Sequence, residues 1–136
     1  MRILTAFTHS LGGQDAYALA ARLSDALSWP MDMVSIIRGG THGAITEGSD
    51  IAYQDVVLQQ VVQWMDEVTY VRPTELPVTK HLRYNDSFPE GLIETAVELG
   101  SSLLVAGGGR HGLTGRVSLG SIGQTLLNAS PVPVAL

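Results

Sequence analysis

The chain has 136 residues, no cysteine, and a formal net charge of −5 from eight basic and thirteen acidic residues. This length predicts one domain, residues 1–136, that folds without disulfides or thiolate-bound metals. The negative charge argues against nucleic acid as a partner, and the lack of a long apolar run or a signal-peptide pattern leads us to expect a cytoplasmic protein without a membrane span.

The first half of the chain alternates strand-like and helix-like apolar runs. We predict a strand at residues 2–7, a helix at 14–27, a second strand at 33–37 and a helix at about 50–70. Trp29 and Pro30 end the first helix, since proline cannot continue it. A glycine-rich segment lies between the second strand and the second helix, and we expect it to be a surface connection.

The second half continues the same alternation. We predict a strand at residues 78–83, a helix at 88–99, a strand at 103–106, a helix at 119–128 and a strand at 132–136. Ser87, Pro89 and Glu90 mark the start of the third helix, because they have the spacing of a capping box with proline in the first turn. Pro131 and Pro133 remove N–H donors around the last strand and limit which neighbour can pair with it.

This alternation predicts a doubly wound α/β fold. Five strands joined by four helices require right-handed crossovers, which produce a mainly parallel sheet covered on both faces. Ligands of such sheets bind beyond the carboxyl ends of the strands, where the strand order reverses. With strand order 3-2-1-4-5 the reversal lies between the first and fourth strands. The loops at residues 8–14 and 107–120 are therefore the predicted ligand crevice.

The most informative stretch of the chain is residues 103–121. An apolar strand gives way to glycines that carry Arg110, His111 and Arg116, and a helix follows. No acidic residue follows Glu98, so this part of the chain is locally positive. Glycines let backbone N–H groups approach a ligand, and the helix adds the positive end of its dipole. The sequence therefore predicts a phosphate-binding loop.

Each of these residues also has an interpretation without a ligand. Arg110 and His111 bind phosphate or form a solvated pair on a flexible loop, and Ser121 binds phosphate or caps the last helix. His9 in the first loop can meet His111 across the crevice, but two histidines without a carboxylate or cysteine make a poor metal site. We therefore predict no metal site. We also predict no catalytic residue, because the chain has no nucleophile elbow and the loop has no carboxylate for Mg²⁺.

Four segments of the chain resemble the universal stress protein family. They are ILTAF with Ser10 at the first strand, RYNDSFPEGLIETAVELGSSLLVAGG, the glycine loop that ends in LGS, and ASPVPVAL at the end. The second segment is the most specific, because it is similar to the family's run of strand, turn, amphipathic helix and buried strand. The resemblance extends over nearly the whole chain. It implies a flavodoxin-like or adenine nucleotide alpha hydrolase-like sandwich with strand order 3-2-1-4-5, and a homodimer formed through the last strand, from Val132 to Leu136.

In one branch of the family the resemblance also implies ATP in the crevice. That branch has the pattern G-x2-G-x9-G-[ST], which this chain matches at the first and last glycines and at the closing hydroxyl. Arg110 departs from it at the second glycine, and Thr8 stands where ATP-binding members usually have an aspartate. The implied nucleotide-binding residues are Thr8, His9, Ser10, Ile36, Gly107, Gly109, Arg110, Gly112, Gly120 and Ser121.

Two hypotheses for the function follow. The first is a stress-response regulator that binds ATP or a related adenine nucleotide, with Mg²⁺ only together with the nucleotide, and acts on an unidentified protein partner. The second is the same fold with a vestigial pocket that serves as a dimeric interaction or scaffold module. Thr8 and Arg110 favour the second, whereas Gly120, Ser121 and the acid-free loop favour the first. Enzymatic activity is expected to be at most slow ATP hydrolysis, and an enzyme for small phosphorylated substrates is a distant third alternative.

Overall fold

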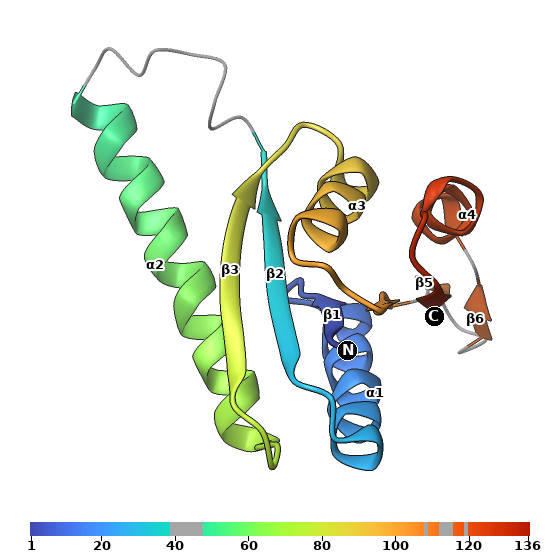
Figure 1. Cartoon of the computed structure of the whole chain (residues 1–136). Helices are drawn as coiled ribbons and strands as arrows, with labels where there is room; N and C mark the ends of the chain where they lie inside the picture. Colours follow the sequence, from blue (N-terminus) through green and yellow to red (C-terminus); the bar gives the residue numbers. More distant parts are fainter. Residues whose placement is uncertain (39–47, 108, 112–115, 119) are drawn as a thin grey trace.

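A five-stranded parallel sheet forms the centre of the molecule in this computed structural model (Figure 1). The structure describes residues 1–38, 48–107, 109–111, 116–118 and 120–136. The strands of the sheet are β1 (Ile3–Ala6), β2 (Met31–Ile37), β3 (Val78–Tyr84), β4 (Leu103–Val105) and β7 (Val134–Ala135). They lie in the order β3-β2-β1-β4-β7, and every neighbouring pair is parallel. The predicted fold class and strand order are confirmed.

Two helices cover each face of the sheet. The helices are α1 (Leu11–Leu27), α2 (Gly48–Val71), α3 (Phe88–Glu98) and α4 (Gly120–Ala129). Figure 1 shows α2 and α4 on opposite sides of the sheet, as expected when the chain winds in one direction from β1 to β3 and in the other from β4 to β7. None of the helices in the described part of the chain is long and apolar enough to cross a membrane.

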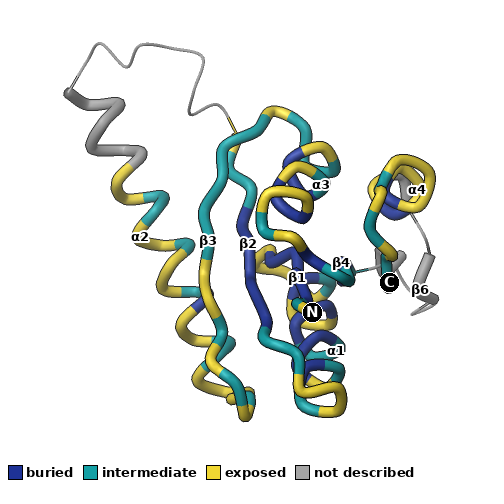
Figure 2. The backbone as a smooth tube through the Cα atoms, viewed as in Figure 1, coloured by how far each residue is buried: buried dark blue, intermediate teal, exposed yellow. Residues whose placement is uncertain are grey.

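Side chains that alternate along β1 divide the core into two clusters. Ile3 and Phe7 pack with α1 and α2, where Tyr17 and Met65 are fully buried. Leu4 and Ala6 belong to the cluster that α3 and α4 cover on the other face. Successive strand residues point to opposite faces, so a central strand of this sheet has to be apolar on both. Figure 2 shows this as buried backbone in the central strands.

The first helix begins three residues earlier than the sequence predicts. The Ser10 hydroxyl accepts a hydrogen bond from the Gly13 N–H at 3.1 Å and caps α1, which starts at Leu11. Gly12 and Gly13 have poor helix propensity, which made this first turn look like loop. The predicted cap of α3 is confirmed, because the Ser87 hydroxyl accepts from the Glu90 N–H at 3.4 Å.

The end of the chain differs from the prediction in two places. The last strand was predicted over residues 132–136, but β7 contains only Val134 and Ala135, since Pro133 has no N–H to donate and residues 130–132 form a turn. In addition, β5 (Gly109–His111) and β6 (Arg116–Ser118) form an antiparallel hairpin where the sequence predicts an irregular loop. Such short, glycine-containing strands lack the alternating pattern that would reveal them.

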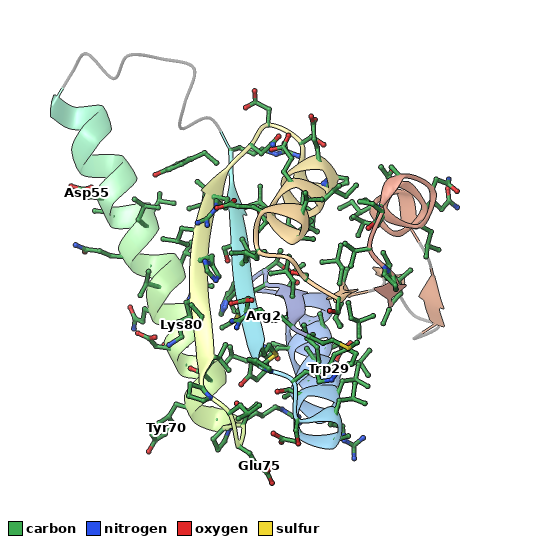
Figure 3. The ribbon with its side chains drawn as sticks, viewed as in Figure 1. Arg2, Trp29, Asp55, Tyr70, Glu75 and Lys80 are labelled. Carbon is green, nitrogen blue, oxygen red and sulfur yellow. The ribbon has the colours of Figure 1, made fainter. Side chains whose placement is uncertain are left out.

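A buried carboxylate ties the amino ends of three strands together. Asp32 on β2 is almost fully buried and accepts hydrogen bonds from Nε and Nη2 of Arg2, each at 2.8 Å. His81 on β3 contributes a third contact, from its Nε2 at 3.0 Å. Figure 3 labels Arg2 beside β2. Burial by itself would raise the pKa of Asp32, but the hydrogen bonds from Arg2 and His81 outweigh burial and lower it.

Candidate functional site

The strand order of the sheet reverses at β1. This strand pairs with β2 on one side and with β4 on the other, so the carboxyl ends of β1 and β4 lie side by side. The connection after β1 leads into α1 on one face, and the connection after β4 leads toward α4 on the other. We call this place, with the loops that leave both strands, the switch point. It is where a doubly wound sheet offers a ligand the ends of two helices.

The loop after β1 is organised around its own hydroxyl groups. The Thr8 and Ser10 hydroxyls lie 2.7 Å apart and share a hydrogen bond, while the Ser10 hydroxyl also accepts from Gly13. Both residues are exposed, and both were predicted to contact a nucleotide. In this arrangement Ser10 caps α1. The Thr8 hydroxyl is neutral and bound within the loop, so it offers no substitute for the aspartate that ATP-binding relatives were expected to carry there.

Two glycines allow close backbone contacts at the switch point. A Cβ atom added to Gly107 would lie 2.1 Å from the Gly12 carbonyl oxygen, so the end of β4 packs directly on the first turn of α1. A Cβ atom added to Gly13 would lie 1.9 Å from the Thr8 carbonyl oxygen. Gly107 was predicted for a close approach to phosphate. The structure gives it a second role, because the space of its missing side chain is filled by the backbone of α1.

The predicted phosphate loop consists of the hairpin and the start of α4. Its register places Gly109 opposite Ser118, Arg110 opposite Val117 and His111 opposite Arg116. Gly120 and Ser121 are the first residues of α4, as an anion site at a helix N-terminus requires. Gly112 lies outside the described residues. Figure 1 shows the hairpin next to α4 and on the far side of the sheet from α2.

Ile36 takes part in core packing against α3. It is half-buried and belongs to the cluster on that face of the sheet. A Cβ atom added to Gly91 in α3 would lie 3.0 Å from two carbon atoms of the Ile36 side chain. Ile36, which the resemblance implied as a nucleotide-binding residue, therefore also packs against the helix that covers this face of the sheet.

His9 lies against α2. Its ring stacks on the indole of Trp64, with centroids 4.1 Å apart and planes 9° from parallel. His9 is thus packed toward α2, and the side chain of His111, the histidine considered across the crevice, lies outside the described part of the structure. The sequence did not reveal this pair, because nothing in the local pattern links residues so far apart along the chain. Among the described residues, no three His, Asp or Glu side chains gather as a metal site.

Comparisons with known proteins agree on one family. The sequence profile described as "Universal stress protein family" matches residues 1–136. A universal stress protein of Mycobacterium tuberculosis is 39% identical over 61 residues, which is 45% of this chain and 21% of that protein. The chain thus corresponds to well under two-thirds of the length of that relative.

Solved structures of low sequence identity have the same fold. A universal stress protein in complex with cAMP has a TM-score of 0.74 at 14% identity, over 99% of this chain and 94% of that chain. The universal stress protein from Archaeoglobus fulgidus in complex with dAMP has a TM-score of 0.66 at 18% identity, over 98% and 94% of the two chains. These matches show that the backbone of this chain follows the same fold as the backbones of those structures.

Proposed function

Because this chain belongs to the universal stress protein family, we propose that it binds an adenine nucleotide at the switch point and acts as a regulator rather than as an enzyme. The observation that carries the proposal is the arrangement of the segment after β4. That segment supplies glycines, two arginines and the N-terminus of α4, and it starts where the strand order reverses. Two structural neighbours are described as complexes with cAMP and dAMP, which supports the adenine class.

The phosphate groups would be bound by the hairpin and α4. The N-terminus of α4 would offer N–H groups that have no partner within the helix, together with the positive end of its dipole, and Gly120 adds no side chain there. Residues 99–136 contain no Asp or Glu, so no side chain of this segment repels an anion. For the same reason the segment offers no ligand for Mg²⁺ and no base to activate water, and any metal ion would have to arrive on the nucleotide.

We propose ATP as the nucleotide, from the match at Gly107, Gly120 and Ser121 to the expected pattern. Thr8 weakens recognition of the nucleoside, because its hydroxyl is bound to Ser10. Backbone N–H groups and Arg110 would therefore account for most of the affinity, and binding would depend on the number of phosphates. We expect ATP to bind more tightly than AMP.

A scaffold without a ligand is the second candidate, and specific contacts favour it. The Gly12 carbonyl fills the space beside Gly107, and His9 is held on Trp64. Both contacts give residues of the predicted site a structural role that needs no nucleotide. Under this second hypothesis the protein binds a protein partner through its surface, and its glycine loop no longer binds a nucleotide.

Titration calorimetry with ATP decides between the two candidates. We expect a Kd below about 100 μM for the wild type and no measurable binding for Gly120→Val, whose side chain would stand at the α4 terminus. Arg110→Ala is expected to weaken binding by roughly 1.5–3 kcal/mol, as one charge-assisted contact does. Mass spectrometry of the gently denatured protein should detect copurified nucleotide.

Gln124→Val is the matched control for the glycine variant, because it adds the same side chain to an exposed position of the same helix. It should bind ATP like the wild type. Equal heats for wild type and Gly120→Val would support the scaffold. Tighter binding by Arg110→Gly, which restores the expected glycine spacing, would show that the natural chain has moved away from ATP.

We also propose that the protein is a homodimer through the edge of β7. This strand pairs with β4 on one side and is the last strand of the sheet. Val134 packs into the core, so Val134→Asp would disturb the fold as well as the edge. Leu136 is 37% exposed next to β7 and is the better position to substitute. An exposed apolar edge of this kind is normally covered.

Sedimentation analysis across a dilution series tests this assembly. We expect a dimer for the wild type at micromolar concentration and a shift toward monomer for Leu136→Glu, since the new charge would be buried between two copies. Exposed Leu127 on α4, changed to Glu, is the control and should leave the dimer intact. A monomeric wild type at the highest concentration would contradict the proposal.

A further inference from the structure

A hollow lies on the face of the sheet covered by α1 and α2. It has a volume of about 290 Å³, at the low end of the range for small-molecule sites. Among the described residues that were predicted to contact a nucleotide, His9 alone lines it. The lining residues are Phe7, His9, Gln14, Trp64, Glu67, Val68, Val71 and Arg72. The hollow is therefore separate from the phosphate loop beside α4.

The inner part of this hollow is apolar and aromatic. Phe7 is 3% exposed and belongs to the core, and Val68 packs partly against it. The stack of His9 on Trp64 holds the indole in a fixed orientation at the wall. Rigid aromatic walls suit a flat ring, because they bury it without first losing their own side-chain freedom. The hollow has room for a molecule with one or two rings.

The rim of the hollow carries one charge of each sign. Glu67 and Arg72 both line it and both are exposed. Within the described residues the Arg72 guanidinium has no hydrogen bond or ion pair, and the Glu67 carboxylate has only a long contact of 3.4 Å from Gln63. The two charges are thus available to a ligand, and the Gln14 amide adds a donor and an acceptor.

We propose that this hollow binds an aromatic α-amino acid. The ring would lie in the apolar part against Phe7 and Trp64, the carboxylate would bind Arg72, and the ammonium would bind Glu67. A zwitterion satisfies both rim charges, whereas an aromatic anion would be repelled by Glu67 and an aromatic cation by Arg72. The hollow has this chemistry whether or not a nucleotide binds at the switch point.

Calorimetry with L-phenylalanine tests the site, with two analogues that each lack one charge. We expect L-phenylalanine to bind with a Kd below about 1 mM, and Arg72→Gln and Glu67→Gln each to weaken it at least about tenfold. 3-Phenylpropionate, which lacks the ammonium, should respond to Arg72→Gln and not to Glu67→Gln. 2-Phenylethylamine, which lacks the carboxylate, should respond in the opposite way.

Arg22→Gln and Glu75→Gln are the matched controls, because both residues are exposed and neither lines the hollow. Figure 3 shows Glu75 in the turn that follows α2. Both variants should bind L-phenylalanine like the wild type, and so should Gly120→Val, which separates this site from the nucleotide proposal. The proposal is wrong if L-phenylalanine produces no heat, if both rim variants bind it normally, or if the two analogues bind as tightly as the amino acid.

Discussion

Gly107→Ala is expected to lower the free energy of unfolding by at least about 3 kcal/mol. The added Cβ atom would lie 2.1 Å from the carbonyl oxygen and 2.6 Å from the carbonyl carbon of Gly12. Both are backbone atoms in the first turn of α1, so no side chain can rotate away to make room. The strain would force β4 and α1 apart and disturb the loop after β1. Urea denaturation followed by far-UV circular dichroism measures the loss.

Gly100→Ala is the control for this substitution. Gly100 has a φ of +64° and an added Cβ atom would meet nothing within 4 Å. Its replacement should therefore cost only the left-handed backbone strain, about 1–2 kcal/mol. A Gly107→Ala variant as stable as Gly100→Ala would contradict the tight packing of β4 on α1. It would also favour the role predicted for Gly107 from the sequence, in which the missing side chain leaves space for a phosphate group.

Asp32→Ala is expected to destabilise the protein by about 3 kcal/mol at neutral pH. The substitution leaves Arg2 and His81 without the carboxylate that accepts three hydrogen bonds from them. The Arg2 side chain is 38% exposed and can turn to water, which keeps the loss at the lower end of the range for buried ion pairs. Asp66→Ala removes an exposed partner of Lys80 and should cost less than about 1 kcal/mol.

The effect of Asp32→Ala should also depend on pH in the acidic range. The pKa of Asp32 is lowered from its ordinary value of 3.8, so its contribution to stability is complete above that value and is lost as pH falls through the lower pKa of the folded state. The difference in stability between wild type and Asp32→Ala should therefore hold down to about pH 4 and shrink below it. Denaturation midpoints measured over this range test the prediction. A difference independent of pH would rule out an ionised Asp32 as its source.

The loop after β1 lies near both candidate sites. The loop after β1 leads into α1, and its residues face two ways from there. Gly12 packs against Gly107 at the end of β4, while His9 lies on α2. This loop therefore contacts both the proposed nucleotide site and the proposed amino acid site. Substituting Trp64 would release His9 and is the direct way to ask whether the two sites influence each other.

The sequence by itself determined the architecture. Apolar periodicity located all five strands of the sheet and the four helices, because burial on one or two faces repeats at intervals that the local sequence shows. The cap at Ser87 could be identified for the same reason, since a capping box involves residues three positions apart. Alternation of strands and helices with right-handed crossovers then left few topologies, and the resemblance to the universal stress protein family implied the observed strand order.

Only the tertiary structure decided what individual polar and small residues do. His81 belongs to none of the motifs described from the sequence, yet its Nε2 lies 3.0 Å from the carboxylate of Asp32, which is 49 positions away along the chain. Gly107 fitted a phosphate loop, but its missing side chain makes room for Gly12, and the hairpin from Gly109 to Ser118 replaced an expected loop. These contacts join segments that are distant along the chain, and their geometry depends on how helices settle on the sheet. Local sequence patterns do not encode that geometry. The sequence therefore predicted which strands and helices surround the site, whereas the contacts between its residues could be seen only in the structure.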